Sequence, residues 1–403
     1  MRPRGGIAYI APMTRIVEEG QEPLGFSLLG GPLHRLGRRL GLVRGTTNTV
    51  AMGLALGVGA WTVLMALALV EGAGPRLFSL SMIAGHVRLL IVVPLFFLCE
   101  SWVDPRMTAF VDTLRRSGVV PGKAMPALQS EIARNLRWKD SWLPEALCLL
   151  ATVLWSTLGS QWAMHGATAA FDPARDSSGM SMAGRWYWFV CLPLFRFLGL
   201  RWIWRLVQWS RFLWRISRLE LHLVPTHPDG TAGLGYLEVV HTHFLPLVLA
   251  LSALQAAGLA EELVRGSMAF EAIYPTLAVV LFVDVALFLG PVFLFTPKLW
   301  ACRVRALSDY MEFASNYVTD FDGKWLAPGA GRGELLLGTP DLQSLADLSN
   351  SMNVVRNMRV VPVNLGLLRD LAIVALLPFL PLLLLKYPIA ELVQKFVARL
   401  TGL

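Results

Sequence analysis

The chain has 403 residues, of which 55% are hydrophobic and only 16% are charged, and its mean hydropathy is +0.53. Soluble globular proteins carry roughly a quarter charged residues, so this composition excludes a disordered chain and disfavours a water-soluble enzyme. The formal net charge of +8 is explained by basic loops on one side of a membrane rather than by nucleic-acid binding. We therefore predict an all-α, polytopic membrane helix bundle without a nucleic-acid partner.

Seven apolar runs have about the length of a membrane-spanning helix, which needs ~20 residues. The first 45 residues lack the apolar core and cleavage site of a signal peptide, so the first span should act as an uncleaved signal. The last run is the shortest and contains Pro378 and Pro381, so it is either a span or a re-entrant segment. The predicted spans are Thr47–Val70, Ser79–Cys99, Leu143–His165, Trp186–Trp209, Phe244–Leu263, Ala272–Phe295 and Leu371–Leu385.

Lysine and arginine are distributed unevenly between alternate loops. With the N-terminus in the cytoplasm, the inside segments hold 25 of the 36 basic residues, the outside segments hold seven, and four lie in spans. This asymmetry predicts a cytoplasmic N-terminus. The predicted parts are a basic cytoplasmic segment 1–46, a six-span bundle 47–297 with cytoplasmic helical loops at 102–142 and 210–243, a cytoplasmic helical segment 298–369, and a last run plus amphipathic C-terminal helix at 370–403.

Three features predict association between helices or subunits. Gly53 and Gly57 form a G-x-x-x-G pattern that lets another helix approach closely, either from the same chain or from another copy. Residues 389–400 form an amphipathic stripe. Residues 339–358 form a helix whose apolar face needs a partner, either the bundle or another subunit. We expect a homo-oligomer embedded in the lipid bilayer. The apolar face comprises Leu342, Leu345, Leu348, Met352 and Val355.

Charged residues inside spans are costly and need a reason. Asp284 lies in the sixth predicted span, Arg196 in the fourth, and His86 and Arg88 in the second. At ~1.5 Å per residue the three spans place Asp284, Arg196 and Arg88 at similar depth. Similar depth permits Asp284 to pair with Arg196 or Arg88. These charges then form either a buried ion pair that fixes the helix register or a polar passage or binding site.

Two segments near the predicted cytoplasmic face are candidates for an anion site. Arg201 and Arg205 stand on one face of the Arg/Trp-rich fourth span, where they either anchor the helix at the interface or bind an anionic headgroup or solute. The second segment is a His-Pro-Asp-Gly loop, which is either a structured turn or a backbone anion site. Together the two segments would form a cytoplasmic mouth. The candidate residues of the loop are His227, Asp229, Gly233 and Gly235.

The same region offers weak candidates for a metal site. Glu238 and His241 form an E-x-x-H pair on a helical turn, and His243 follows. Such pairs occur in some helical metal sites. One pair does not define a site, so no cofactor is predicted.

Three stretches carry a resemblance to a known family. They are HPD-x3-GLG at 227–235, VVRNMRVVP at 354–362, and the proline-broken LPFLPLL at 377–383. The chain resembles an uncharacterised family of bacterial multi-pass inner-membrane proteins over its last half and the Pro94–Asp104 region. The resemblance implies a bacterial inner membrane as the location and implies no particular activity.

These observations leave three classes of function open. The leading hypothesis is passage or gating of an ion or small solute, including an anionic one, with Asp284 and Arg196 along the route. The second is a sensor or assembly subunit without transport activity, which binds a partner through its cytoplasmic helices. The third is a membrane enzyme with a His/Glu metal site.

Overall fold

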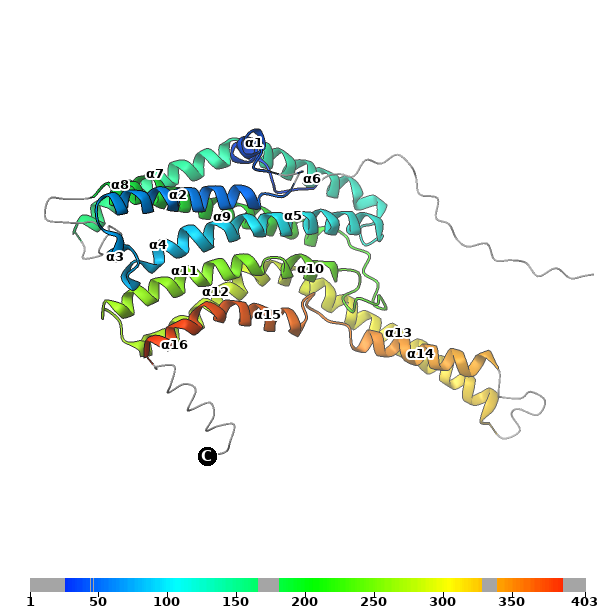
Figure 1. The fold of residues 1–403 in the computed structure, drawn as a ribbon. Coiled ribbons are helices and arrows are strands. Elements are labelled where there is room, and N and C mark those ends of the chain that lie inside the picture. The colour runs from blue at the N-terminus through cyan, green and yellow to red at the C-terminus, as the bar shows by residue number, and fades with distance from the viewer. Residues whose placement is uncertain (1–25, 44, 46, 166–180, 328–338, 387–403) are drawn as a thin grey trace, which may run out of the picture.

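All regular elements of the described residues are helices, which confirms the all-α fold (Figure 1). The computed structural model describes residues 26–43, 45, 47–165, 181–327 and 339–386. The α-helices are α1 (Gly31–Arg39), α2 (Val50–Val70), α3 (Gly74–Leu77), α4 (Ile83–Val87), α5 (Val93–Arg116), α6 (Met125–Asp140), α7 (Leu143–His165), α8 (Met182–Trp186), α9 (Leu192–Arg218), α10 (Tyr236–Thr242), α11 (Leu245–Val264), α12 (Ile273–Asp284), α13 (Thr296–Trp325), α14 (Pro340–Arg356), α15 (Leu365–Leu376) and α16 (Leu380–Lys386). Short 3-10 turns are η1 (Leu80–Met82), η3 (Gly122–Ala124), η5 (Phe270–Ala272), η7 (Gly290–Phe295) and η8 (Leu377–Phe379).

Five helical stretches of the described residues are long and apolar enough to cross a membrane. They fit an integral membrane protein. The two other predicted spans correspond to α7 and to the stretch from α8 to α9. The apolar part of α7 within the described residues is shorter, and α9 carries many arginines. The count of seven spans therefore stays a prediction. The five stretches are Val50–Val70, Ile83–Arg116, Tyr236–Val264, Phe270–Trp325 and Leu365–Leu383.

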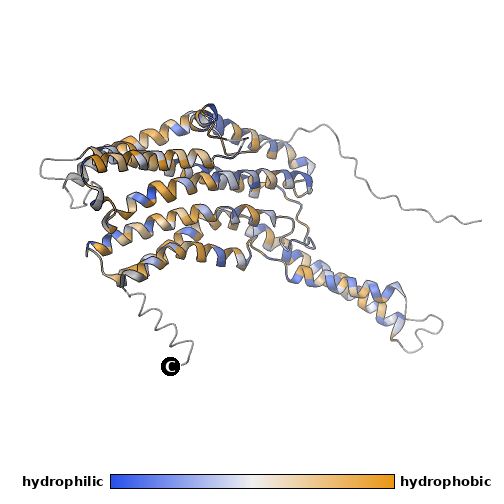
Figure 2. Cartoon of the chain, in the orientation of Figure 1, coloured by the Kyte–Doolittle hydropathy of each residue, from blue (hydrophilic) through white to orange (hydrophobic). Residues whose placement is uncertain are grey.

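The long helices lie side by side in a bundle with two distinct ends (Figure 1). We call the end where α5 and α9 finish the basic end, because the last turns of these helices carry Arg115, Arg116, Arg215 and Arg218. The helices α2 and α11 finish at the opposite end. Apolar residues predominate along the bundle, whereas hydrophilic residues are more frequent in the α13–α14 hairpin that extends beyond the basic end (Figure 2). The last run, α15 to α16, follows α11 toward the opposite end, which favours a span over a re-entrant segment.

Three of the long helices contain a π-helical turn just before a proline. These turns are η2 (Arg88–Val92), η4 (Tyr187–Cys191) and η6 (Val285–Leu289). Each ends two residues before Pro94, Pro193 or Pro291. Proline has no N–H to donate and its ring clashes with the carbonyl four residues earlier, so a wider turn relieves the clash without ending the helix. The prolines thus set where these helices widen.

The G-x-x-x-G pattern of α2 is used inside the chain. A Cβ at Gly57 would lie 2.3 Å from the Leu89 carbonyl oxygen, and one at Gly53 would lie 2.7 Å from the Phe97 Cβ. Both glycines therefore allow α2 to pack directly on η2 and α5. Of the two readings of this pattern, the structure realises the contact within one chain.

The apolar face of 339–358 also finds a partner within the chain. The helices α13 and α14 pack as an antiparallel hairpin (Figure 1). Met352 and Val355 are 8% and 0% exposed. The helix α13 thus covers part of this face, whereas Leu342 at its other end is 45% exposed, so a contact of the remaining part with the bundle or another subunit stays a prediction. The predicted amphipathic helix at 389–400 lies outside the described residues.

Candidate functional site

A cluster of buried charges lies inside the bundle. Glu100 belongs to α5, Arg201 and Arg205 to α9, and Glu145 to the first turn of α7. Their side chains are 2%, 5%, 6% and 13% exposed, in that order. Charges at such depth are strongly destabilising unless they are paired. We call these four residues the Glu100 cluster and take them as the candidate site.

Glu100 is shared by both arginines. The Nη1 atom of Arg201 donates to Oε1 of Glu100 at 2.7 Å, and its Nε atom donates to Oε1 of Glu145 at 3.1 Å. Arg205 forms an ion pair with the same oxygen of Glu100. The guanidinium carbon of Arg205 also lies 5.5 Å from the centre of the Trp202 ring. The two guanidinium groups therefore already hold two carboxylate groups in the interior, which is the kind of ligand that arginine recognises best.

Local sequence spacing explains why these charges meet. Residues four apart stand above one another on a helix. Arg201 and Arg205 are so related on α9, and Glu100 and Asp104 are so related on α5. Because α5 and α9 pack together, an acidic pair on one helix faces a basic pair on the other.

Asp104 fastens the N-terminal segment, residues 26–39, to the bundle. Its Oδ1 atom accepts hydrogen bonds from the backbone N–H groups of Leu28 at 2.7 Å and Leu29 at 3.2 Å. Its Oδ2 atom accepts one from the Ser27 hydroxyl at 2.8 Å. The Thr108 hydroxyl donates to the Phe26 carbonyl oxygen. The segment therefore begins on the same face of α5 that carries Glu100.

The Glu100 cluster itself holds the next part of the N-terminal segment. Glu145 Oε2 accepts a hydrogen bond from the backbone N–H of Leu33 at 2.9 Å. The Gly30 carbonyl oxygen accepts one from Arg201 Nη2 at 3.5 Å. A Cβ at Gly31 would lie 2.4 Å from Glu145 Oε1, and the φ of Gly31 is +87°. Only glycine fits this close approach without strain. The segment therefore lies directly against the charge cluster.

His34, on α1, faces the cluster from the N-terminal segment. It is 7% exposed, and its Nε2 atom has no hydrogen-bond partner among the described residues. Burial lowers the pKa of His34 below its ordinary value, and the positive charges of Arg201 and Arg205 lower it further, against the opposing effect of Glu100. A neutral imidazole thus lies beside the two arginines at neutral pH.

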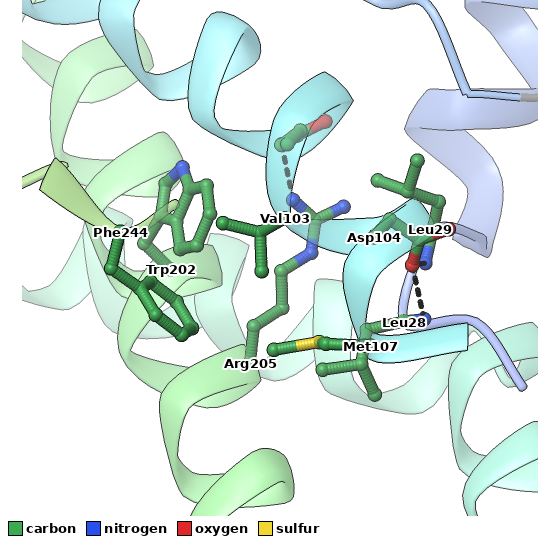
Figure 3. A pocket seen from close by; sticks show the side chains of 9 residues that line it. Leu28, Leu29, Val103, Asp104, Met107, Trp202, Arg205 and Phe244 are labelled. Atoms are coloured by element: carbon green, nitrogen blue, oxygen red, sulfur yellow. Dashed lines mark hydrogen bonds and ion pairs between the residues drawn. The ribbon is translucent and has the colours of Figure 1, made fainter. Parts of the chain in front are cut away.

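A small cavity adjoins Glu100, Asp104 and Arg205 (Figure 3). Its volume is about 20 Å³, which is room for about one water molecule. The Nη2 atom of Arg205 is buried and has no hydrogen-bond partner among the described residues. The remaining wall is apolar. The lining residues are Leu28, Leu29, Glu100, Val103, Asp104, Met107, Trp202, Arg205 and Phe244.

The predicted pairing of Asp284 with Arg196 or Arg88 does not occur. Asp284, 2% exposed, accepts a hydrogen bond from the Ser252 hydroxyl at 3.4 Å. Arg196 instead donates to the Ser156 hydroxyl at 3.0 Å and lies over the Trp155 ring, both on α7. Equal depth sets the height of a side chain but not the direction in which it points, and these side chains point to different neighbours.

His86 and Arg88 are held at the opposite end of the bundle by aromatic partners. The indole N–H of Trp61 donates to His86 Nδ1 at 2.9 Å, and His86 Nε2 donates to the Leu77 carbonyl oxygen at 2.7 Å. Arg88 donates to the Tyr187 hydroxyl. Arg88 and Tyr187 are the first residues of the π turns η2 and η4, so this bond joins the two wide turns.

The His-Pro-Asp-Gly loop is a closed turn that is built around one carboxylate. Asp229 accepts hydrogen bonds from the N–H groups of Thr231 at 2.8 Å, Gly233 at 3.1 Å and Gly235 at 2.7 Å. Burial alone would raise the pKa of Asp229, but these three N–H groups hold it below the ordinary value. His227 Nδ1 lies 2.9 Å from the same carboxylate. The backbone donors that an external anion would need are therefore already bonded to Asp229.

Arg359 binds this loop to the segment that follows α14. Its backbone N–H donates to the Gly230 carbonyl oxygen at 2.8 Å, and its Nη2 donates to the Asp229 carbonyl oxygen at 3.0 Å. Its Nη1 pairs with Glu238 at 2.8 Å. The HPD-x3-GLG and VVRNMRVVP stretches thus contact each other. None of the hydrogen bonds or ion pairs that the structure describes for this loop joins it to Arg201 or Arg205, so the mouth that they would share stays a prediction.

The weak metal candidates bind protein groups in different directions. Glu238 pairs with Arg359. His241 Nδ1 bonds the Phe288 carbonyl oxygen at 2.6 Å, and His243 Nδ1 bonds the Val239 carbonyl oxygen at 2.7 Å. Within the described ranges, no three His, Cys, Asp or Glu side chains are grouped so that they could hold a metal ion. The structure does not bring these three residues together.

Sequence reasoning missed Glu100, Asp104 and Glu145. These acids stand at the ends of apolar runs, where a charge is ordinarily solvated, so hydropathy does not distinguish them from loop residues. The signal that could have found them is the equal spacing of Glu100–Asp104 and Arg201–Arg205 on helices that both enter the bundle.

Comparisons with known proteins add no further evidence, since no protein-family model, curated protein or solved structure matches the chain. The class of the protein therefore follows from its fold and its site: it is a helical membrane protein with a charge cluster enclosed inside the bundle.

Proposed function

We propose that the protein passes or gates an ion or small solute, and that the Glu100 cluster is the point on the route where the solute binds. The observation that carries the proposal is the pair of buried arginines whose carboxylate ligands are supplied by Glu100 and Glu145. An anionic solute with oxygen ligands would replace one carboxylate on the same guanidinium groups. Asp284 and Arg196 are not paired, so the proposed route does not depend on them.

The N-terminal segment is the proposed closure of this route. It is hydrogen-bonded to Asp104 and Glu145. Its helix α1 therefore lies over one side of the cluster. Competition of a solute for Arg201 would free Glu145 and weaken the bond to Leu33. Release of the segment and exposure of the arginines are then linked, because one carboxylate takes part in both.

The test is flux into liposomes reconstituted with purified protein, with chloride, inorganic phosphate, acetate and potassium as separate probes. A single Arg205→Gln change leaves Arg201 as the partner of both buried carboxylates, Glu100 and Glu145, and this excess negative charge should cost ~3–5 kcal/mol of stability. The double change Glu100→Gln with Arg205→Gln removes one charge of each sign and leaves Arg201 paired with Glu145. We expect this variant to fold and to lose flux of at least one anion. The matched control is Arg215→Gln, an exposed position on the same helix.

An unchanged anion flux in a well-folded double variant would refute the proposed site. Potassium flux that exceeds every anion flux would keep passage but reject the anionic solute.

A partner-binding function is the second candidate, and the α13–α14 hairpin favours it. The hairpin extends beyond the bundle (Figure 1). Its surface exposes Met311, Phe313 and Val318 by 52%, 59% and 41%. Homo-oligomerisation and an inner-membrane location remain proposals that rest on the sequence. Mass measurement in mild detergent tests the oligomer, and a Phe313→Ser variant that becomes monomeric would place the contact on the hairpin.

A further inference from the structure

A second, larger hollow opens on the outside of the bundle between α5, α11 and α15. It has a volume of about 380 Å³. The helix α11 packs against both α5 and α15 and lies between them in Figure 1, so it forms the floor while the other two form the walls. We call this hollow the α11 groove. Its lining residues are Leu95, Leu98, Trp102, Thr242, His243, Leu245, Pro246, Leu249 and Val374.

The α11 groove is apolar along its length and polar at one end. Leu98 and Trp102 are one helical turn apart on α5, and Leu245 and Leu249 are one turn apart on α11. Both helices belong to stretches long and apolar enough to cross a membrane. Toward the basic end the lining changes to Thr242 and His243. Trp102, 50% exposed, has the residue type that is enriched at the level of lipid headgroups.

Arg106 stands at this polar end. It lies one turn beyond Trp102 on the same face of α5, and its Nε atom donates to His243 Nε2 at 3.2 Å. His243 Nδ1 must donate to the Val239 carbonyl oxygen, 2.7 Å away, because a carbonyl can only accept. The imidazole is therefore neutral, and its Nε2 atom accepts a hydrogen bond from the Nε–H of Arg106. This bond does not use the two terminal amino groups of the guanidinium.

Those terminal amino groups have no carboxylate partner among the described residues. Asp370, one turn before Val374 on α15, is paired with Arg369 at 2.9 Å. Arg106 is exposed, and a planar guanidinium binds a phosphate through two parallel hydrogen bonds. The end of the groove thus has the positive charge and the N–H donors that a phosphate needs, and the rest has an apolar surface for hydrocarbon.

We propose that the α11 groove is a binding site for an anionic phospholipid, with the acyl chain along Leu95, Leu98 and Leu249 and the phosphate on Arg106. This site is independent of the proposed solute route. The lining residues Leu98 and Trp102 are offset by two positions from Glu100 and Asp104, and two positions on a helix correspond to nearly opposite faces. The groove therefore faces lipid while the Glu100 cluster faces the interior.

The experiment is native mass spectrometry of the full-length protein after incubation with an equal mixture of phosphatidylglycerol and phosphatidylcholine that carry the same acyl chains. We expect retention of phosphatidylglycerol to exceed that of phosphatidylcholine by about tenfold, the factor that corresponds to ~1.4 kcal/mol. Arg106→Gln should abolish this preference. Arg116→Gln, which removes the same charge from the exposed end of the same helix, should preserve it.

A second variant separates the groove from the charge. Leu249→Trp fills the apolar part of the α11 groove and leaves Arg106 unchanged, so it should reduce retention of both lipids. Retention that is equal in the Arg106→Gln and Arg116→Gln proteins would overturn the proposal. Inorganic phosphate that displaces the lipid, and that still binds the Leu249→Trp protein, would also overturn it in favour of a free phosphate site. A dimer that Leu249→Trp converts to monomer would show that a second copy occupies the groove.

Discussion

The carboxylate of Asp229 illustrates how one residue can organise a loop. Three backbone N–H groups converge on it, and together they outweigh the effect of burial on its pKa. Gly233, with a φ of +99°, provides the turn that brings these N–H groups together, because glycine adopts this conformation without strain. The sequence shows the turn residues, and the structure adds that Arg359 binds the finished turn.

Asp229→Ala should destabilise the protein by ~1–3 kcal/mol, because three N–H groups lose an ionised acceptor. The folded pKa lies below the ordinary value, so this contribution is fully present above the unfolded pKa and disappears as pH falls through the folded pKa. Chemical unfolding at pH 7 measures the effect, and the difference between wild type and variant should shrink below about pH 4. Asp140→Asn, at an exposed acid, is the control and should show no such pH dependence.

Asp284 and Arg196 should contribute to stability independently of each other, because they do not pair. Their side chains bond Ser252 and Ser156, on different helices. The double-mutant cycle of Asp284→Asn and Arg196→Gln should therefore give a coupling free energy within about 0.5 kcal/mol of zero. Thermal unfolding of the four proteins in detergent measures it. A coupling of several kcal/mol would mean that the two charges do pair in the bilayer.

At the scale of elements, hydropathy predicts much of the bundle. The apolar runs locate the helices that contain Val50–Val70, Ile83–Arg116 and Leu365–Leu383, but they do not give every end: the run predicted to end at Cys99 continues as a helix to Arg116. The contacts between helices do not follow, because similar apolar residues cover every face of a span. The sequence therefore does not show that Arg196 contacts Ser156 and Trp155 of α7, or that α14 packs on α13. The π turns before the prolines were not predicted either, because proline alone is equally compatible with a kink.

The attachment of the N-terminal segment is another property of elements, and it rests on Asp104. Asp104→Ala removes the acceptor for Leu28, Leu29 and Ser27. We expect the segment to detach more often, so that trypsin cleaves after the exposed Arg35 and Arg38 about tenfold faster, as for a loss of ~1.4 kcal/mol in local stability. Gel analysis of a digestion time course in detergent measures the rate.

Asp112→Ala is the matched control for this prediction, because Asp112 lies two turns further along α5 and none of the bonds to the segment involve it. An equal cleavage rate in the two variants would mean that Asp104 does not hold the segment.

At the scale of the whole molecule, the basic residues and the α13–α14 hairpin both mark the same end of the bundle. The last turns of α5 and α9 carry arginines, and the α13–α14 hairpin extends from that same end. The loop near residue 125 and the hairpin must therefore lie on one side of the membrane, whichever side that is. The asymmetry of 25 basic residues inside against seven outside, counted for a cytoplasmic N-terminus, predicts that the side is the cytoplasm.

Reporter fusions at residues 125, 175 and 330 test this orientation in bacterial cells. Alkaline phosphatase is active only outside the cytoplasm, so the fusion at 175 should be active and the fusions at 125 and 330 inactive. A fusion at Gly72, where α2 has reached the opposite end, is the control and should match 175. Activity at 125 and 330 together with silence at 175 would invert the orientation and leave the bundle intact. Different results at 125 and 330 would contradict the bundle itself, because α5 and α13 both run toward the basic end (Figure 1).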